Sequence, residues 1–258
     1  MTDPGPPSSF PPPPPNLAPP PGYVGYERGP GGQVPLQRVQ KLRTALFVLL
    51  AIVAVGSLVV LATTPAQVDA ARELLDGTID SDTFTERQAG SSLAQLLVGA
   101  STIAIIVLTM IWLYRIAKNH RALGRQGTWG PGWAIGGWFL PPVLYVIPTL
   151  MLREHWKASE PGVPPGDDRW RSAKEPVLVY VWFVLYSVVP LALAIAGSAT
   201  FFRGFGQDAE DLAEALEDTQ GLSMASAAVT TLAAVAWFLV VKGLTERHTA
   251  LTGENAGR

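Results

Sequence analysis

The chain has 258 residues, of which 48% are hydrophobic and only 16% are charged. A soluble domain usually carries about 25% charged residues, so this composition indicates exposure to lipid. The net charge of −2 predicts no basic face for nucleic acid, and we expect no nucleic-acid partner. Because cysteine is absent, disulfides, iron–sulfur clusters, thiolate zinc sites and a cysteine nucleophile are excluded.

A proline-rich segment opens the chain. Residues 1–37 contain 13 prolines, and Pro11 to Pro15 are consecutive. Such a segment has too little apolar surface to fold and favours polyproline II conformations. We expect residues 1–40 to be a disordered cytoplasmic tail, with a docking arm for a partner's aromatic groove as the alternative.

Four later segments are apolar and about twenty residues or longer, which as helices would rise about 30 Å and cross a bilayer. They are residues 44–63, 93–114, 177–202 and 222–241. The loops 64–92 and 203–221 are strongly acidic, whereas loop 115–132 carries four basic residues and no acid. Apolar residues at helical spacing predict short helices within both acidic loops.

A fifth apolar segment, residues 133–152, contains Pro141, Pro142 and Pro148. Proline removes a backbone hydrogen bond and clashes with the preceding helical turn, so the adjacent pair should break the segment. If this segment does not cross, the basic flanks, loop 153–176 and the C-terminal tail 242–258 all lie in the cytoplasm, as the positive-inside rule favours.

We therefore predict an all-α, polytopic membrane helical bundle. It has four transmembrane helices plus a proline-broken re-entrant or interfacial segment, and both termini are cytoplasmic. A kinked but genuine fifth span is the alternative. Ionisable residues are absent from the spans, which argues against proton-coupled transport and intramembrane aspartyl or zinc proteolysis.

The stretch after the second span contains candidate binding residues. Trp112, Arg115 and Asn119 share one helical face. We expect these residues to form a structural clamp that holds the broken segment, together with interfacial anchoring by Trp and Arg. The alternative is a polar cluster at the cytoplasmic mouth of the bundle, in which Arg115 and Asn119 meet Glu154 and bind a lipid head group or a partner. His120, His155 and Glu154 lack metal-ligand spacing, so we expect no metal and no cofactor.

This stretch resembles a known family. The matching motifs are Arg115-x3-Asn119-x2-Ala122-Leu123-Gly124, Pro131-Gly132-Trp133-Ala134-x2-Gly137-Trp138-Phe139-x-Pro141, Pro148, and Arg153-Glu154-x-Trp156-x-Ala158-Ser159. They are similar to the domain of unknown function 4328 family of actinobacterial membrane proteins. The resemblance implies structural roles for Trp112, Gly124, Pro131, Trp133, Gly137, Trp138, Phe139, Pro141, Pro148 and Trp156. The family commonly has an asparagine where this chain has Leu144, and it carries no established activity.

The function that we expect is a non-enzymatic assembly or regulatory protein of a bacterial inner membrane. Its partners would be the lipid bilayer and either a second copy of itself or another membrane protein. One alternative is a small oligomeric channel or transporter that uses the broken segment. A second alternative is a lipid-acting enzyme at the cytoplasmic face, working through Arg115, Asn119 and Glu154.

Overall fold

The computed structural model describes residues 35–139, 146–198 and 208–254, and within these ranges the secondary structure is helical without any strand. The predictions for the proline-rich tail, for Pro141 and Pro142 and for Leu144 concern residues outside these ranges.

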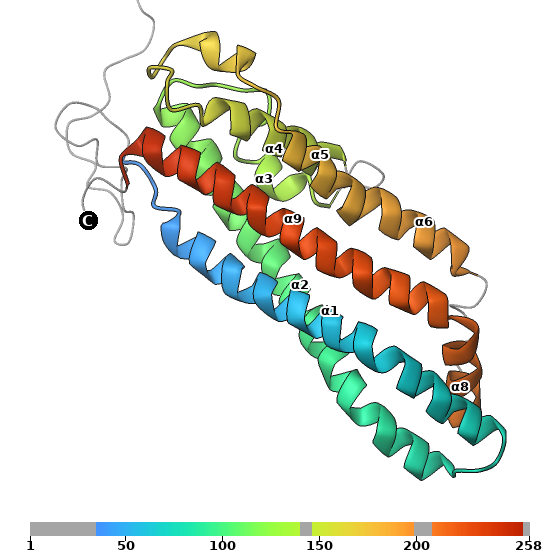
Figure 1. The fold of residues 1–258 in the computed structure, drawn as a ribbon. Helices are drawn as coiled ribbons and strands as arrows, with labels where there is room; N and C mark the ends of the chain where they lie inside the picture. The colour runs from blue at the N-terminus through green and yellow to red at the C-terminus, as the bar shows by residue number, and fades with distance from the viewer. Residues whose placement is uncertain (1–34, 140–145, 199–207, 255–258) are drawn as a thin grey trace, which may run out of the picture. The chain divides into compact units, whose positions relative to one another are not determined.

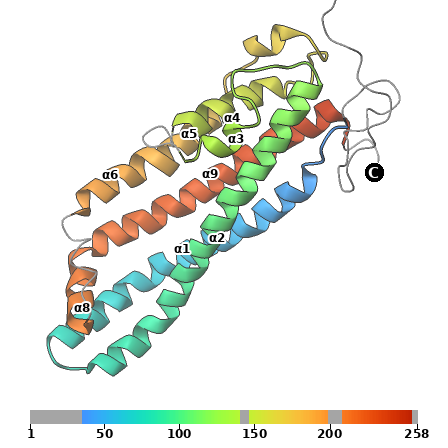
Figure 2. The ribbon, with the colours of Figure 1, turned by 180° about the vertical axis from the view of Figure 1, so that it is seen from behind.

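Four helical stretches are long and apolar enough to cross a membrane, which confirms the predicted bundle. They are α1 (Gln40–Leu75), α2 (Ser81–Ala122), the unit α5–η2–α6 (Val177–Ala196) and α9 (Gln220–Thr252). The third unit joins α5 (Val177–Phe183) to α6 (Val189–Ala196) through one π-helical turn, η2 (Val184–Val188). Helix α1 packs along both α2 and α9, while α5, η2 and α6 lie along α9 (Figures 1 and 2).

Large aromatic residues join the spans in the core. Trp237 of α9 meets Trp112 of α2 edge-on, with ring centroids 6.2 Å apart, and lies 4.5 Å from Trp182 of α5. Trp182 in turn stacks on Tyr186 of the π turn at 4.8 Å. Burial of such rings supplies large apolar contact areas, so these four side chains fix α2, α5 and α9 against one another.

Helices α1 and α2 are longer than the predicted spans. Their 36 and 42 residues rise about 54 and about 63 Å, whereas the hydrocarbon layer is about 30 Å thick. The helix predicted in loop 64–92 is a continuation of α1 through Pro65. The helix predicted in loop 203–221 is α8 (Ala209–Asp218).

These extensions build a small separate core, which we call the tip (residues 64–92 and 208–221). Leu74 of α1, Phe84 of α2 and Ala213 of α8 pack together there and are buried. Asp80 and Asp208 begin α2 and α8 as N-caps, accepting hydrogen bonds from the backbone N–H of Thr83 and Asp211. A carboxylate at this position satisfies one of the free N–H groups of the first turn.

The broken segment consists of two short helices in the ranges described. They are α3 (Trp133–Gly136) and α4 (Val146–Ala158), and the 13 described residues of α4 rise about 20 Å. Both lie with the beginning of α1 and the ends of α2 and α9 (Figure 1). We call this end the base (residues 36–43, 115–139, 146–176 and 242–254).

Candidate functional site

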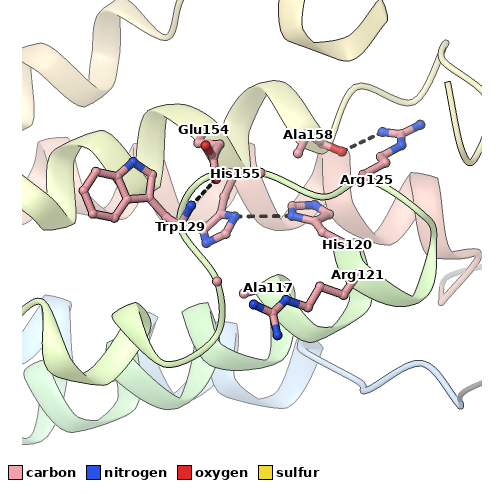
Figure 3. A pocket seen from close by; sticks show the side chains of 10 residues that line it. Ala117, His120, Arg121, Arg125, Trp129, Glu154, His155 and Ala158 are labelled. Carbon is pink, nitrogen blue, oxygen red and sulfur yellow. Dashed lines mark hydrogen bonds between the residues drawn. The ribbon is translucent and has the colours of Figure 1, made fainter. Parts of the chain in front are cut away.

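All three histidines of the chain meet in the base, and we call them the three-histidine cluster. His120 ends α2, His155 lies on α4 and His248 lies on α9, and all three are buried. The Nδ1 atoms of His120 and His155 are 3.3 Å apart (Figure 3), and the rings of His120 and His248 are 5.2 Å apart. Within the described ranges no group of three metal-ligating side chains has the geometry for an ion.

Asn119 joins the cluster to the segment that precedes α1. Its Nδ2 donates to the Gln37 carbonyl at 2.8 Å and lies 2.9 Å from Nε2 of His248, while its Oδ1 accepts from the Gln37 N–H at 2.7 Å. Because Asn119 donates with both amide hydrogens, Nε2 of His248 must accept, and this assigns the ring proton of His248 to Nδ1. Asn119 thus binds two parts of the chain to α2.

The start of α1 is held by two further residues. The Glu254 carboxylate accepts from the backbone N–H of Val39 and Gln40 at 3.1 and 3.2 Å, which satisfies free donors at the helix N-terminus. Arg115 donates from Nη1 to the Arg38 carbonyl at 2.9 Å. The first turn of α1 is therefore fastened to the ends of both α2 and α9.

Glu154 of α4 holds the loop that follows α2. Its two carboxylate oxygens accept from the backbone N–H of Thr128 at 2.8 Å and of Trp129 at 2.9 Å. Figure 3 shows the contact with Trp129. Gly127 makes this approach possible, because a Cβ at that position would overlap the Glu154 carboxylate. The loop and α4 are in this way joined by charge-assisted hydrogen bonds.

Arg125 is a buried polar residue of the base that binds several backbone carbonyls. It is 1% exposed and donates to the carbonyls of Ala158 at 2.6 Å, Glu160 at 2.9 Å and Val163. Figure 3 shows the contact with Ala158. In the sequence Arg125 is only one of the four basic residues of loop 115–132, because nothing in its spacing distinguishes a buried arginine from an exposed one.

A small cavity is lined by residues of this region, Arg125 and Glu154 among them. Its volume is about 10 Å³, room for about one water molecule, and His155, Arg121 and Trp129 are among its lining residues (Figure 3). Nε2 of His155 is buried and has no hydrogen-bond partner in the described part of the chain. Burial lowers the pKa of His155 to about 4, so this imidazole is neutral at pH 7.

The alternative of a polar cluster has to be corrected. Arg115 and Asn119 bind the segment before α1, whereas Glu154 binds the loop after α2, and no hydrogen bond or ion pair joins Glu154 to either of them in the ranges described. The physical reason is that buried polar groups take the nearest backbone partners, which one helical face cannot predict. Glu154 holds the loop at Thr128 against α4, whereas Arg115 and Asn119 hold the start of α1 and not the broken segment.

The tryptophans, proline and glycines of the family signature occupy packing positions. Trp156 lies against Gly243 of α9, where a Cβ would come 2.7 Å from the indole. A Cβ at Gly137 would likewise come 2.6 Å from the side chain of Ile147. Gly124 has a positive φ of 69° and lies beside Gly166.

The other signature residues divide by exposure. Trp112, Pro131 and Pro148 are buried, Trp138 is half-buried against Tyr186, and Trp133 meets Trp129 edge-on. Phe139 is exposed, and Pro141 lies outside the ranges described.

Comparison with known proteins identifies the family. No curated protein and no solved structure matches the chain. A family described as "Domain of unknown function (DUF4328)" matches residues 75–246, which include the end of α1, all of α2 and α4, and most of α9. This match covers more than half of the chain and agrees with the resemblance in the Trp112–Trp156 stretch. The chain is therefore a member of the DUF4328 family.

Proposed function

We propose that this chain is a non-enzymatic membrane protein that acts as a scaffold in assembly or regulation. One observation carries the proposal: the polar side chains of the base bind the protein's own backbone. Asn119, Arg125 and Glu154 together engage carbonyls and amides of three separate segments. Such contacts give a rigid base and leave these groups occupied.

The same contacts argue against a lipid-acting enzyme. A general acid or base must reach the substrate proton, at about 3 Å or through one water. Both oxygens of Glu154 already accept backbone hydrogen bonds, and Asn119 uses its oxygen and both of its amide hydrogens. Catalysis through these residues would require breaking the hydrogen bonds that hold the loop after α2 and the start of α1.

The proposal includes an orientation with both termini and the base in the cytoplasm. Its support is the distribution of charge, since the base carries the basic loop 115–132 and the tip carries the acidic helices. The shortness of α4 supports a segment that enters without crossing.

Thiol labelling tests this orientation, because the chain has no native cysteine. Gly162→Cys places a thiol at an exposed position of the base where a Cβ meets no atom within 4 Å, and Ser81→Cys places one in the tip. In intact cells an impermeant reagent should label Ser81→Cys and should label Gly162→Cys only after lysis. Labelling of Gly162→Cys in intact cells would overturn the orientation.

The scaffold role is tested by crosslinking and mass spectrometry in native membranes. We expect a crosslink to a second copy of the chain or to another membrane protein. The crosslink should persist in Glu154→Gln and should be lost when residues 1–37 are deleted. Turnover of a lipid by purified protein, abolished in Glu154→Gln, would instead support the enzyme. Solute flux through liposomes containing the purified chain would support the channel.

A further inference from the structure

A second, larger cavity lies on the other side of the loop that Glu154 holds. Its volume is about 350 Å³, and it opens between α4, the loop at Thr128 and the 3₁₀ helix η1 (Asp168–Ser172). Three cationic side chains and one acid line it: Arg153, Lys157 and Arg171, with Glu154. The indoles of Trp129 and Trp170 form its aromatic walls. We call it the cationic cavity.

Two of the three cations that line the cavity bind one carboxylate. Arg153 and Lys157 are one helical turn apart on α4 and donate to the Glu175 carboxylate, from Nε and Nη2 of Arg153 at 2.8 and 2.7 Å and from Nζ of Lys157 at 2.5 Å. The Tyr180 hydroxyl adds a fourth donor at 3.1 Å. Hydrogen bonds from Arg153 and then Lys157 hold the pKa of Glu175 well below its usual range.

Each cation also keeps a donor for a ligand. Arg171 donates from Nε to Asp168 at 3.2 Å and from Nη2 to the Gln126 carbonyl at 2.7 Å. Within the ranges described, Nη1 of Arg171, Nη1 of Arg153 and one proton of Lys157 remain unused. The one acid on the wall, Glu154, accepts a backbone amide hydrogen bond on each of its two oxygens.

The position of the cavity along the chain places it at the edge of the bilayer. Glu175 precedes the third span by two residues, since that span begins at Val177. Arginine, lysine and tryptophan are typical of this boundary, where basic pockets between helices bind anionic head groups.

We propose that the cationic cavity binds a phosphate group, with Arg153, Lys157 and Arg171 as its ligands. Arginine matches a phosphate with two parallel hydrogen bonds, and lysine supplies a point charge. Glu175 holds Arg153 and Lys157 side by side when no ligand is bound. The phosphate belongs either to an anionic phospholipid or to a soluble molecule, and both share this chemistry. The site goes beyond the proposed function, because a scaffold requires no ligand.

Binding by the purified full chain tests the proposal. The protein in zwitterionic detergent is titrated with phosphatidylglycerol, with phosphatidylcholine and with inorganic phosphate, and binding is followed by native mass spectrometry. We expect phosphatidylglycerol to bind and phosphatidylcholine not to bind. Arg171→Gln and Lys157→Gln should each weaken binding about tenfold, as removal of one charge-assisted hydrogen bond does.

A matched control and two outcomes complete the test. Arg169→Gln removes a charge from the same 3₁₀ helix without touching the cavity, because Arg169 is 73% exposed and pairs with Asp167. This variant should bind like the wild type, and unfolding curves should show that all three variants fold. Tight inorganic phosphate binding, weakened by the same two substitutions, would identify a soluble phosphate compound as the source. Binding that both Arg171→Gln and Lys157→Gln leave unchanged, or no binding of either probe, would overturn the site.

Discussion

The contacts that stabilise the base differ in kind from those that stabilise the tip. In the base, buried polar groups such as Asn119 and Arg125 bind the backbone of segments distant in sequence. In the tip, a few apolar side chains around Phe84 form the core, and ion pairs such as Arg72–Glu217 lie on the surface. A buried polar contact costs several times more to break than an exposed ion pair, so mutations in the two regions should differ sharply in effect.

The largest expected effect comes from Arg125 in the base. Arg125→Gln leaves up to three buried carbonyls without their donor and should lower the free energy of unfolding by about 4 kcal/mol. Equilibrium unfolding in mixed micelles containing SDS measures it. Arg169→Gln, an exposed arginine of the same region, should cost less than about 1 kcal/mol. Equal effects of the two substitutions would contradict the role of the buried Arg125 hydrogen bonds in stabilising the base.

Acid should weaken the base through His155. The pKa of this imidazole is about 4 in the folded chain and near 6.5 when unfolded, so between these values the unfolded chain binds more protons. Stability should therefore fall by about 3 kcal/mol as the pH drops from 7 to 4. His155→Gln should reduce the loss of stability between pH 7 and pH 4. Protonation of His120 and His248 should account for the loss that remains in this variant. An unchanged profile in the variant would disprove the contribution of His155.

Removal of the Asn119 side chain should have an intermediate effect. Asn119→Ala leaves the Gln37 N–H and carbonyl without partners and should cost about 2 kcal/mol. Hydrogen exchange followed by mass spectrometry should show faster exchange at Gln37, while the tip around Phe84 keeps its rate. Gln126→Ala, at an exposed position of the same region, is the control.

The smallest effect is expected in the tip. Arg72→Gln breaks an ion pair whose side chains are 47% and 43% exposed, and it should cost less than about 1 kcal/mol. Phe84→Ala, in the buried core of the tip, should cost about 3 kcal/mol and serves as the positive comparison. A loss at Arg72 as large as that at Phe84 would show that charge, and not apolar burial, holds the tip.

Sequence reasoning succeeded where the signal is periodic and failed where it depends on long-range contact. Apolar runs of about twenty residues identified all four spans, and the helical spacing of Leu212 and Leu216 predicted α8. The break predicted at Pro141 and Pro142 lies outside the residues that the structure describes and stays a prediction.

The candidate site was harder to predict. Arg115 and Asn119 lie on α2, as their spacing predicted, but their partners come from the chain before α1 and from α9. His120, His155 and His248 have no regular spacing, and only the packing of three helices brings them together. Spacing within one helix cannot reveal which other helix lies against it.

The uninterrupted course of α2 has a mechanical consequence. This one helix carries Phe84 at one end and Asn119 near the other, with no proline or π turn between them. Its backbone hydrogen bonds run without a break from the tip to the base. We therefore expect a tilt or rotation of α2 in the tip to shift the hydrogen bonds between Asn119 and Gln37 at the other end.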